Sequence, residues 1–403
     1  MTSLTSTSNP AQLGFDPQRL QRINNLMENY VASGKTAGMV TLVSRRGEIV
    51  HLDSRGYMDI KAQTPMRTDS IFRIYSMTKA ITSVAMMTLL EQGFFQLDDV
   101  VQRWIPALKS LKVYREDGKL DELETDITIR QLLTHTAGFS YGFEPDLHPV
   151  DKLYDARWKA LKPSDTLEDL LNLMFEVPLI AQPGSRWHYS IATDICGHLI
   201  ELISGKRLGE YLHETILEPL GMVDTGFELP AEKLDRFTTL YGKAGDDPLA
   251  VLQTPASSPY ALPVNIHYGG GGLVSTASDY LNFAQMMLNG GVLDGSRIIG
   301  PKTIDWMTMN QLPEAMLPLR FNGIVPQQLD AYGFGLGYCI NMDPARAGTL
   351  GSQGDYGWGG LADTYCWIDP KEALIGILMQ QYIPSLAHAG RRDFRNAVYQ
   401  ALI

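Results

Sequence analysis

The stretch that most constrains the fold is an apolar run over residues 76–92. Its apolar side chains occupy nearly every side of the helix that it predicts, which is typical of a helix buried in the middle of a protein. They are Ala80, Ile81, Val84, Ala85, Met86, Met87, Leu89 and Leu90. Gly93, directly after the run, is a common helix stop. We therefore expect the rest of the chain to pack around this helix.

Lys79 is unusual in the first turn of such a helix. An ammonium group there meets the positive end of the helix dipole and also loses hydration. Ser76 comes three residues earlier, so the two side chains lie side by side. A hydroxyl next to a lysine of lowered pKa is an activated nucleophile. The alternative that this pattern leaves open is that Ser76 caps the helix and Lys79 reaches the solvent.

Length, charge and cysteine content exclude several classes of protein. A chain of 403 residues can bury a large core, as one large or two interlocked domains. The net charge of −11 and the lack of a basic run argue against nucleic acid or an anionic membrane as a partner. The three cysteines, Cys196, Cys339 and Cys366, are too widely spaced for a metal motif or a disulfide framework.

The N-terminal residues contain neither the basic nor the apolar segment of a signal peptide, and no run of about 18 apolar residues occurs. We therefore expect a cytoplasmic protein without a membrane span. Nothing in the sequence suggests a metal or an organic cofactor, and a small molecule is the expected partner. The oligomeric state stays open.

Both ends of the chain carry strand patterns. Residues 39–43 and 48–52 predict a hairpin, which follows a helix that starts at Asp16-Pro17 and ends at Gly34. The late strands are predicted over residues 333–340, 361–368 and 373–379, before a final helix over residues 385–402. We expect an α/β (α+β) fold, in which one antiparallel sheet is built from both ends of the chain and flanked by the terminal helices.

The middle of the chain is expected to be a mainly helical insertion. Helices are predicted after the caps Thr128 and Thr166 and over residues 191–203, and a further helix over residues 278–288. The predicted division is an α/β domain of residues 1–93 and 265–403 and a mainly helical domain of residues 94–264. The active site would lie in the cleft between them.

Two further segments have features of a functional site. Tyr189 directly precedes the helix predicted at Ile191, so its hydroxyl can point into a cleft; equally, it can be a half-buried tyrosine that bonds to the backbone. Residues 356–361 read Tyr-Gly-Trp-Gly-Gly-Leu before a predicted strand. Glycines there allow a substrate to approach the backbone closely, although a plain turn would have the same composition.

Together, Ser76-x-x-Lys79, Tyr189-Ser190 and Trp358-Gly359-Gly360 resemble the three motifs of the serine β-lactamase and penicillin-binding protein fold. Within that fold the chain is most similar to the family VIII carboxylesterases, which are relatives of class C β-lactamases. Residues 132–138 and 271–276 support the resemblance, which covers nearly the whole chain. It implies a β-lactamase/transpeptidase-like fold.

The resemblance also implies roles for individual residues. Ser76 would be the acylated nucleophile, and Lys79 and Tyr189 would shuttle its proton. The backbone N–H groups of Ser76 and Leu361 would form the oxyanion hole. Geometry favours that last role too, because donors at a helix N-terminus and a strand edge are held in place before charge develops.

Two departures from the lactamase pattern bear on the substrate. Ile191 stands where lactamases carry an asparagine that contacts the substrate amide, and Trp358 stands where Lys-Thr-Gly supplies a cation. We expect such a site to hold β-lactams and D-alanyl peptides poorly and an uncharged ester with an apolar part well. The predicted substrate contacts are Trp358, Gly359, Gly360, Tyr141 and Ile191.

The expected activity is therefore hydrolysis of short- to medium-chain carboxylesters, with weak β-lactamase activity as a side reaction. A β-lactamase, D-aminopeptidase or acyltransferase with the same Ser-Lys-Tyr chemistry is the first alternative. A catalytically inactive binding or scaffold protein is the second.

The replacement of the Lys-Thr-Gly lysine by Trp358 also bears on which group acts as the base. A tyrosine pKa of about 10 would have to fall by roughly 2–3 units for a useful phenolate population. One ammonium about 4 Å away supplies about 4 kcal/mol at an effective dielectric near 20. We therefore hypothesise that a Tyr189 phenolate is the base and charged Lys79 its partner. Either residue remains a candidate for the base.

Residues 138–142 read Gly-Phe-Ser-Tyr-Gly, a Gly-x-Ser-x-Gly sequence like that of α/β-hydrolases. In those enzymes the motif follows a strand and precedes a helix. Here a capped helix over residues 129–134 precedes it, and Pro145 follows closely. No His–Asp pair stands out as partners for Ser140, although His267 and His388 lie downstream. We therefore expect this loop to line the pocket through Tyr141.

Overall fold

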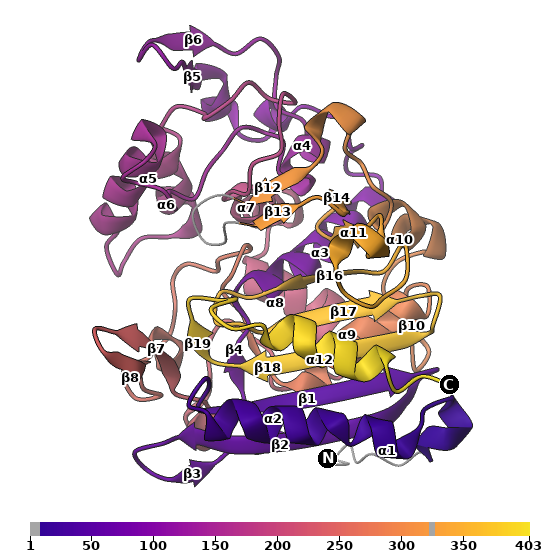
Figure 1. The fold of residues 1–403 in the computed structure, drawn as a ribbon. Coiled ribbons are helices and arrows are strands. Elements are labelled where there is room, and N and C mark those ends of the chain that lie inside the picture. Colours follow the sequence, from indigo (N-terminus) through magenta and orange to yellow (C-terminus); the bar gives the residue numbers. More distant parts are fainter. Residues whose placement is uncertain (1–8, 322–326) are drawn as a thin grey trace.

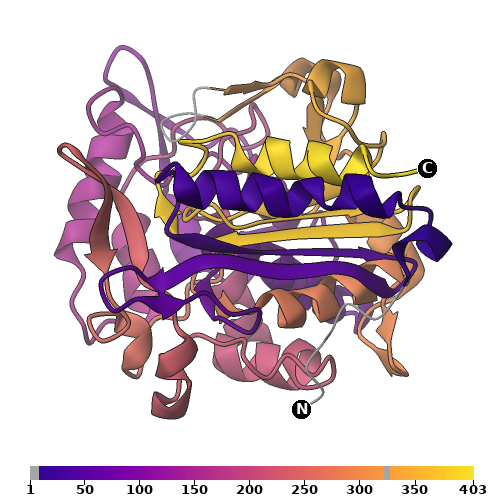
Figure 2. The ribbon, with the colours of Figure 1, turned by 60° about the horizontal axis from the view of Figure 1, so that its bottom comes forward.

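The computed structural model describes residues 9–321 and 327–403, and it contains one large antiparallel sheet (Figures 1 and 2). The sheet has eight strands in the order β14-β15-β16-β17-β18-β1-β2-β3. The N-terminal strands are β1 (Gly38–Arg45), β2 (Glu48–Asp59) and β3 (Thr64–Pro65). The C-terminal strands are β14 (Tyr332–Phe334), β15 (Cys339–Asn341), β16 (Tyr356–Gly359), β17 (Tyr365–Asp369) and β18 (Leu374–Gln380). The prediction of one antiparallel sheet made from both chain ends is confirmed.

Strands β1 and β18 are buried on both faces, because helices cover each side. All residues of β1 and β18 are buried. Helices α2 (Arg22–Ala32) and α12 (Gly390–Tyr399) lie side by side over one face, where they pack on Trp367 (Figure 2). Helix α9 (Ala277–Leu288) packs against β1, β17 and β18. Side chains that alternate along each strand thus enter two separate cores.

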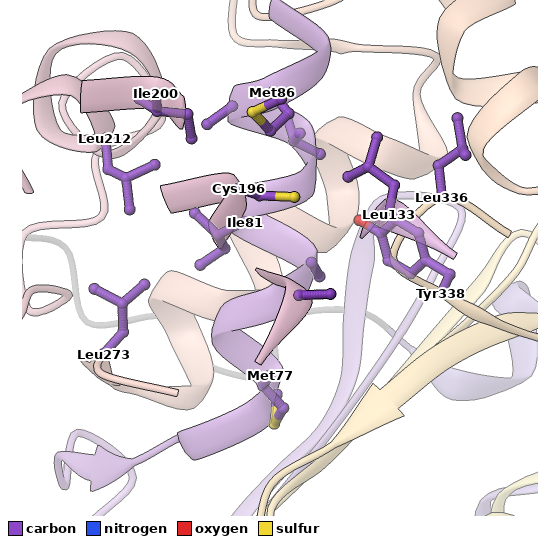
Figure 3. Packing of buried hydrophobic residues seen from close by; sticks show 14 of the residues in the cluster. Met77, Ile81, Met86, Leu133, Cys196, Ile200, Leu212, Leu273, Leu336 and Tyr338 are labelled. Atoms are coloured by element: carbon purple, nitrogen blue, oxygen red, sulfur yellow. The ribbon is translucent and has the colours of Figure 1, made fainter. Parts of the chain in front are cut away.

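Helix α3 (Thr78–Glu91) lies in the main core, as its sequence predicts. Every residue from Thr78 to Leu89 is buried. Figure 3 shows Ile81 and Met86 near Cys196 and Ile200 of α7 (Ala192–Ser204) and Leu212 of α8 (Leu208–Leu212). The helix begins two residues later than predicted, because Tyr75–Met77 forms a 3₁₀ turn before it.

The predicted helix caps are present in the middle of the chain. Capping boxes at Thr128 and Thr166 open α4 (Ile129–Leu133) and α6 (Leu167–Met174). Helix α7 ends at Gly205, which adopts a left-handed conformation. The strands β7 (Leu240–Ala244) and β8 (Asp247–Gln253) form a hairpin that pairs with β19 (Tyr382–Ile383). The division at residues 94–264 stays a prediction.

Four further helices and four strand pairs lie outside the large sheet. The helices are α1 (Pro17–Leu20), α5 (Pro149–Ala160), α10 (Pro301–Met307) and α11 (Pro344–Ala347). The strand pairs are β4 (Phe72–Arg73) with β9 (Val274–Ser275), β5 (Lys112–Tyr114) with β6 (Leu120–Glu122), β10 (Val292–Leu293) with β11 (Ser296–Arg297), and β12 (Leu319–Phe321) with β13 (Gln327–Leu329). Among the described helices, none is long and apolar enough to cross a bilayer.

Three predicted boundaries near the C-terminus are wrong. Residues 333–340 form two strands, because the chain turns at Gly337, whose φ is +90°. Residues 361–364 form a turn, and the strand that was expected from Leu361 starts at Tyr365. The final helix is shorter than residues 385–402, since it starts only after the segment that follows β19.

Candidate active site

Ser76 lies in a strained turn between β4 and α3. The preceding residue, Tyr75, has a φ of +42°, which is unfavourable for a tyrosine and is typical of functional sites. Neighbouring elements hold this turn. Ile74 N–H donates to the Leu273 carbonyl at 3.1 Å, and the Tyr280 hydroxyl donates to the Met77 carbonyl at 3.0 Å. Ser76 is therefore presented in a fixed orientation at the wall of a cavity.

Lys79 lies behind Ser76 and is only 2% exposed. Its Nζ is 3.4 Å from Ser76 Oγ, 2.9 Å from the Tyr141 hydroxyl and 2.5 Å from the Gly270 carbonyl oxygen. The three protons of an ammonium group thus have three acceptors. The alternative that Lys79 reaches the solvent is wrong.

The same contacts show what a neutral Lys79 would do. The Tyr141 hydroxyl donates its proton to Asp194 Oδ2 at 3.0 Å, so it is an acceptor toward Lys79. The Gly270 carbonyl can only accept. A neutral amine that donates to these two groups has one lone pair left, and the remaining hydrogen-bond partner is the Ser76 hydroxyl. This geometry suits removal of the Ser76 proton.

Asp194, in the first turn of α7, is a site residue that the sequence analysis missed. It is 2% exposed, and its Oδ1 accepts from Gly270 N–H at 2.9 Å. A Cβ atom at position 270 would lie 2.4 Å from the Tyr141 hydroxyl and 2.5 Å from Asp194 Oδ2, so only glycine fits there. The available signal was a carboxylate among the apolar residues of a buried helix.

The pKa shifts of the site follow from burial and from this carboxylate. Burial lowers the pKa of Lys79 to about 7, although the Asp194 carboxylate opposes the shift. Burial raises the pKa of Tyr189 above its usual value, and hydrogen bonds with Ser76 and Trp358 only partly offset this. Both directions oppose the hypothesis of a Tyr189 phenolate beside a charged Lys79.

Tyr189 contacts both Lys79 and Trp358, which belongs to strand β16 of the sheet. Its ring lies under the Lys79 ammonium, with Nζ 4.6 Å from the ring centroid. Its hydroxyl accepts a hydrogen bond from Trp358 Nε1 at 3.2 Å. The ring of His135 also packs against it, with a centroid distance of 4.8 Å. The structure therefore brings Ser76, Lys79, Tyr189 and Trp358 together from three distant parts of the chain.

Ser76 and Leu361 both line the cavity, but Leu361 occupies a turn rather than the predicted strand edge. This turn links β16 to β17. Gly360 N–H donates to the Thr364 carbonyl at 2.8 Å, and Asp363 N–H donates to the Gly360 carbonyl at 3.0 Å. A Cβ at position 360 would lie 2.4 Å from the Ile74 carbonyl oxygen, so glycine lets this turn approach the Ser76 segment.

The cavity in front of Ser76 has a volume of about 970 Å³. Aromatic residues and arginines both line it. The phenylalanine, tyrosine and tryptophan residues are Tyr75, Tyr141, Phe143, Trp158, Tyr189, Tyr268, Tyr332, Trp358 and Tyr365, and the arginines are Arg346, Arg391, Arg392 and Arg395. Trp358 in place of a lysine therefore does not leave the cavity without cations.

Four of the five predicted substrate contacts line this cavity: Trp358, Gly359, Gly360 and Tyr141. Ile191 does not. It is 1% exposed and belongs to the main hydrophobic core at the start of α7. Its expected contact with a substrate is wrong for this structure, because the backbone turn before α7 directs the side chain inward.

Ser140 of the Gly-x-Ser-x-Gly sequence does have a His–Asp pair beside it, contrary to expectation. Its hydroxyl donates to Asp151 Oδ1 at 2.5 Å and lies 3.2 Å from His188 Nε2. Because the only proton of Ser140 goes to Asp151, His188 can only donate to this oxygen. Burial also lowers the pKa of His188, to about 4. His188 therefore cannot act as a base toward Ser140, which is itself 1% exposed.

The two downstream histidines, His267 and His388, have other neighbours. His267 stacks on Phe227, with ring centroids 4.4 Å apart, and His388 packs on Tyr382 at 5.4 Å.

Known proteins resemble this chain over nearly its whole length. A model of the Beta-lactamase family matches residues 23–400. Uncharacterized protein MT1414 of Mycobacterium tuberculosis (strain CDC 1551 / Oshkosh) is 35% identical over 362 residues, which cover 88% of each chain. Esterase EstB of Burkholderia gladioli is 29% identical over 389 residues, which cover 92% of each chain.

Among solved structures, EstCE1, described as a hydrolase with promiscuous acyltransferase activity, superposes with a TM-score of 0.80 at 26% identity. The match covers 95% of this chain and 99% of that chain. Hydrolases and acyltransferases thus share this fold. The chain belongs to the beta-lactamase family, as a family VIII esterase-like member of the serine β-lactamase and penicillin-binding protein superfamily.

Proposed function

We propose that this protein is a carboxylester hydrolase that works through an acyl-enzyme on Ser76. The observation that carries the proposal is the arrangement around Lys79. Its neutral amine, held by Tyr141 and Gly270, has the Ser76 hydroxyl as its remaining partner. With a pKa of about 7, a large fraction of Lys79 is neutral at physiological pH. Lys79, rather than Tyr189, is then the base.

In the acylation step, Lys79 takes the Ser76 proton while Oγ attacks the ester carbonyl carbon. The negative charge moves to the carbonyl oxygen, where the N–H groups of Ser76 and Leu361 stabilise it. The C–O bond to the alcohol then breaks, and the neutral Tyr189 hydroxyl passes a proton to the leaving oxygen, with Lys79 restoring it. A water molecule then attacks the acyl-enzyme carbonyl through the same steps, which releases the acid and regenerates Ser76.

The lining of the cavity supports an ester with apolar groups. Phenylalanine, tyrosine and tryptophan side chains line the cavity in front of Ser76 and offer apolar contact to an acyl chain or to the alcohol part. The similarity to Esterase EstB supports the same substrate class.

Acyl transfer to an alcohol is the second candidate. A cavity of about 970 Å³ has room for an acceptor beside a short acyl group, and the similar EstCE1 is described as having promiscuous acyltransferase activity. Hydrolysis and transfer share the acyl-enzyme and differ only in whether water or an alcohol attacks it. Adding a primary alcohol to the assay and measuring the new ester against the free acid separates the two.

The deciding experiment compares wild type, Ser76→Ala and Ser140→Ala on p-nitrophenyl esters from acetate to laurate. We expect Ser76→Ala to abolish turnover and Ser140→Ala to retain it. Retained activity in Ser76→Ala would refute the acyl-enzyme. Nitrocefin, a chromogenic β-lactam, is assayed in parallel, and lactam turnover above ester turnover would favour a β-lactamase. Covalent labelling of Ser76 by a fluorophosphonate would exclude an inactive scaffold.

A further inference from the structure

We propose that Arg391 is a positioning residue for the oxyanion hole, because its guanidinium holds the peptide group that presents the Leu361 N–H to the cavity. Arg391 Nη2 donates to the Gly360 carbonyl oxygen at 2.6 Å. That carbonyl and the Leu361 N–H belong to the same peptide unit. The inference rests on the proposed function, since the oxyanion hole is part of it.

The geometry of the peptide unit carries the argument. The Gly360–Leu361 peptide is trans, so its C=O and N–H point in opposite directions. Two donors, Arg391 Nη2 and Asp363 N–H, fix the carbonyl side. The N–H side has no acceptor within the described residues, and Leu361 lines the cavity. Holding the carbonyl therefore aims the N–H at the space in front of Ser76.

Arg391 is itself held on a rigid part of the fold. Its Nε forms an ion pair with Asp363 Oδ1 at 2.7 Å, and the two side chains are 15% and 3% exposed. Asp363 Oδ2 accepts from Gln380 Nε2 at 2.7 Å, and Gln380 ends the central strand β18. The guanidinium also lies so close to Gly359 that a Cβ there would be 2.2 Å from Nη1. Gln380 of β18 thus holds Asp363, Asp363 holds Arg391, and Arg391 holds the turn.

Charge adds to orientation. A cation that hydrogen-bonds a carbonyl oxygen polarises the whole peptide group and strengthens its N–H as a donor. The guanidinium belongs to a residue of α12, which lies outside the motif that contains Trp358. A positive charge therefore acts on this turn although the motif itself supplies no lysine.

The test uses the full-length protein with two variants, Arg391→Lys and the double variant Arg391→Gln/Asp363→Asn. The double variant avoids a buried, unpaired carboxylate, and asparagine tolerates the left-handed backbone of residue 363, whose φ is +66°. We expect kcat to fall by about tenfold to a hundredfold in both, with KM nearly unchanged, because an oxyanion donor acts mainly in the transition state. Affinity for an alkyl boronic acid, which forms a tetrahedral adduct on a serine, should fall by the same factor.

The matched control is Arg45→Gln. Arg45 also binds a backbone carbonyl, that of Leu13 at 2.8 Å, and pairs with a carboxylate, Glu372 at 2.7 Å, but it lies outside the cavity lining. It should keep wild-type kcat and boronic acid affinity. A wild-type kcat together with a wild-type boronic acid affinity in the double variant would overturn the proposal. A loss of kcat with unchanged boronic acid affinity would also overturn it. Failure of the proposed function is distinct, because wild type itself would then lack turnover that depends on Ser76.

Discussion

Lys79 Nζ lies 2.9 Å from the hydroxyl oxygen of Tyr141, and that hydroxyl donates to the buried Asp194. A single tyrosine hydroxyl therefore connects the lysine beside the nucleophile with a carboxylate on another helix. This link sets the charge state of Lys79, because burial disfavours the ammonium while the carboxylate favours it. Predictions about pH and about Tyr141 follow from it.

The first prediction concerns the pH dependence of kcat/KM for an ester. Lys79 acts as a base only when neutral, so activity should rise with pH through about 7 and then level off. Asp194→Asn removes the anion that raises the lysine pKa, so the midpoint should move to lower pH. The other groups near Lys79 are Ser76, Tyr141, Tyr189 and the neutral His135. A midpoint that stays in place or moves upward in Asp194→Asn would contradict the assignment of Lys79 as the base.

The second prediction concerns Tyr141→Phe. The variant leaves both Lys79 and Asp194 without one buried partner, which costs about 1–3 kcal/mol for each group. We expect a kcat lower by about tenfold and a lower unfolding temperature. Unchanged kcat across the pH range would show that the hydroxyl takes no part in holding Lys79.

The third prediction separates Tyr189 from Trp358. Tyr189→Phe removes the hydroxyl that passes the proton to the leaving group, so kcat should fall by about 10²- to 10⁴-fold. Trp358→Phe removes the indole donor and part of the ring but leaves the Tyr189 hydroxyl in place, so it should cost less. Circular dichroism serves as the control for folding. Near-normal turnover by Tyr189→Phe would rule out the shuttle.

The fourth prediction concerns Ser140→Ala, which should affect stability rather than activity. Asp151 and His188 would each lose a buried hydrogen-bond partner, at a cost of about 1–3 kcal/mol for each in the free energy of unfolding. Ester turnover should stay within a few-fold of wild type. Urea unfolding measures the first quantity and a p-nitrophenyl ester assay the second. A large loss of kcat in a stably folded variant would assign Ser140 a catalytic part.

Much of the fold could be predicted from local patterns. The hairpin of β1 and β2, the caps at Asp16, Thr128 and Thr166, and the buried helix after Ser76 depend on short-range periodicity and capping, which single segments contain. The strand boundaries near Gly337 and Leu361 could not be predicted from local patterns. Turns there depend on long-range contacts, such as the approach of Gly360 to Ile74.

By itself, the sequence determined the buried helix that starts beside Ser76, the sheet made from both chain ends, and the three motifs expected to meet at that serine. Only the tertiary structure decided what surrounds Lys79, because Asp194, Tyr141 and Gly270 come from segments far from it in the chain. Their distances and burial set its pKa, and no spacing in the sequence encodes either. The same holds for Arg391, which reaches the turn at Gly360 only because α12 packs back over the sheet.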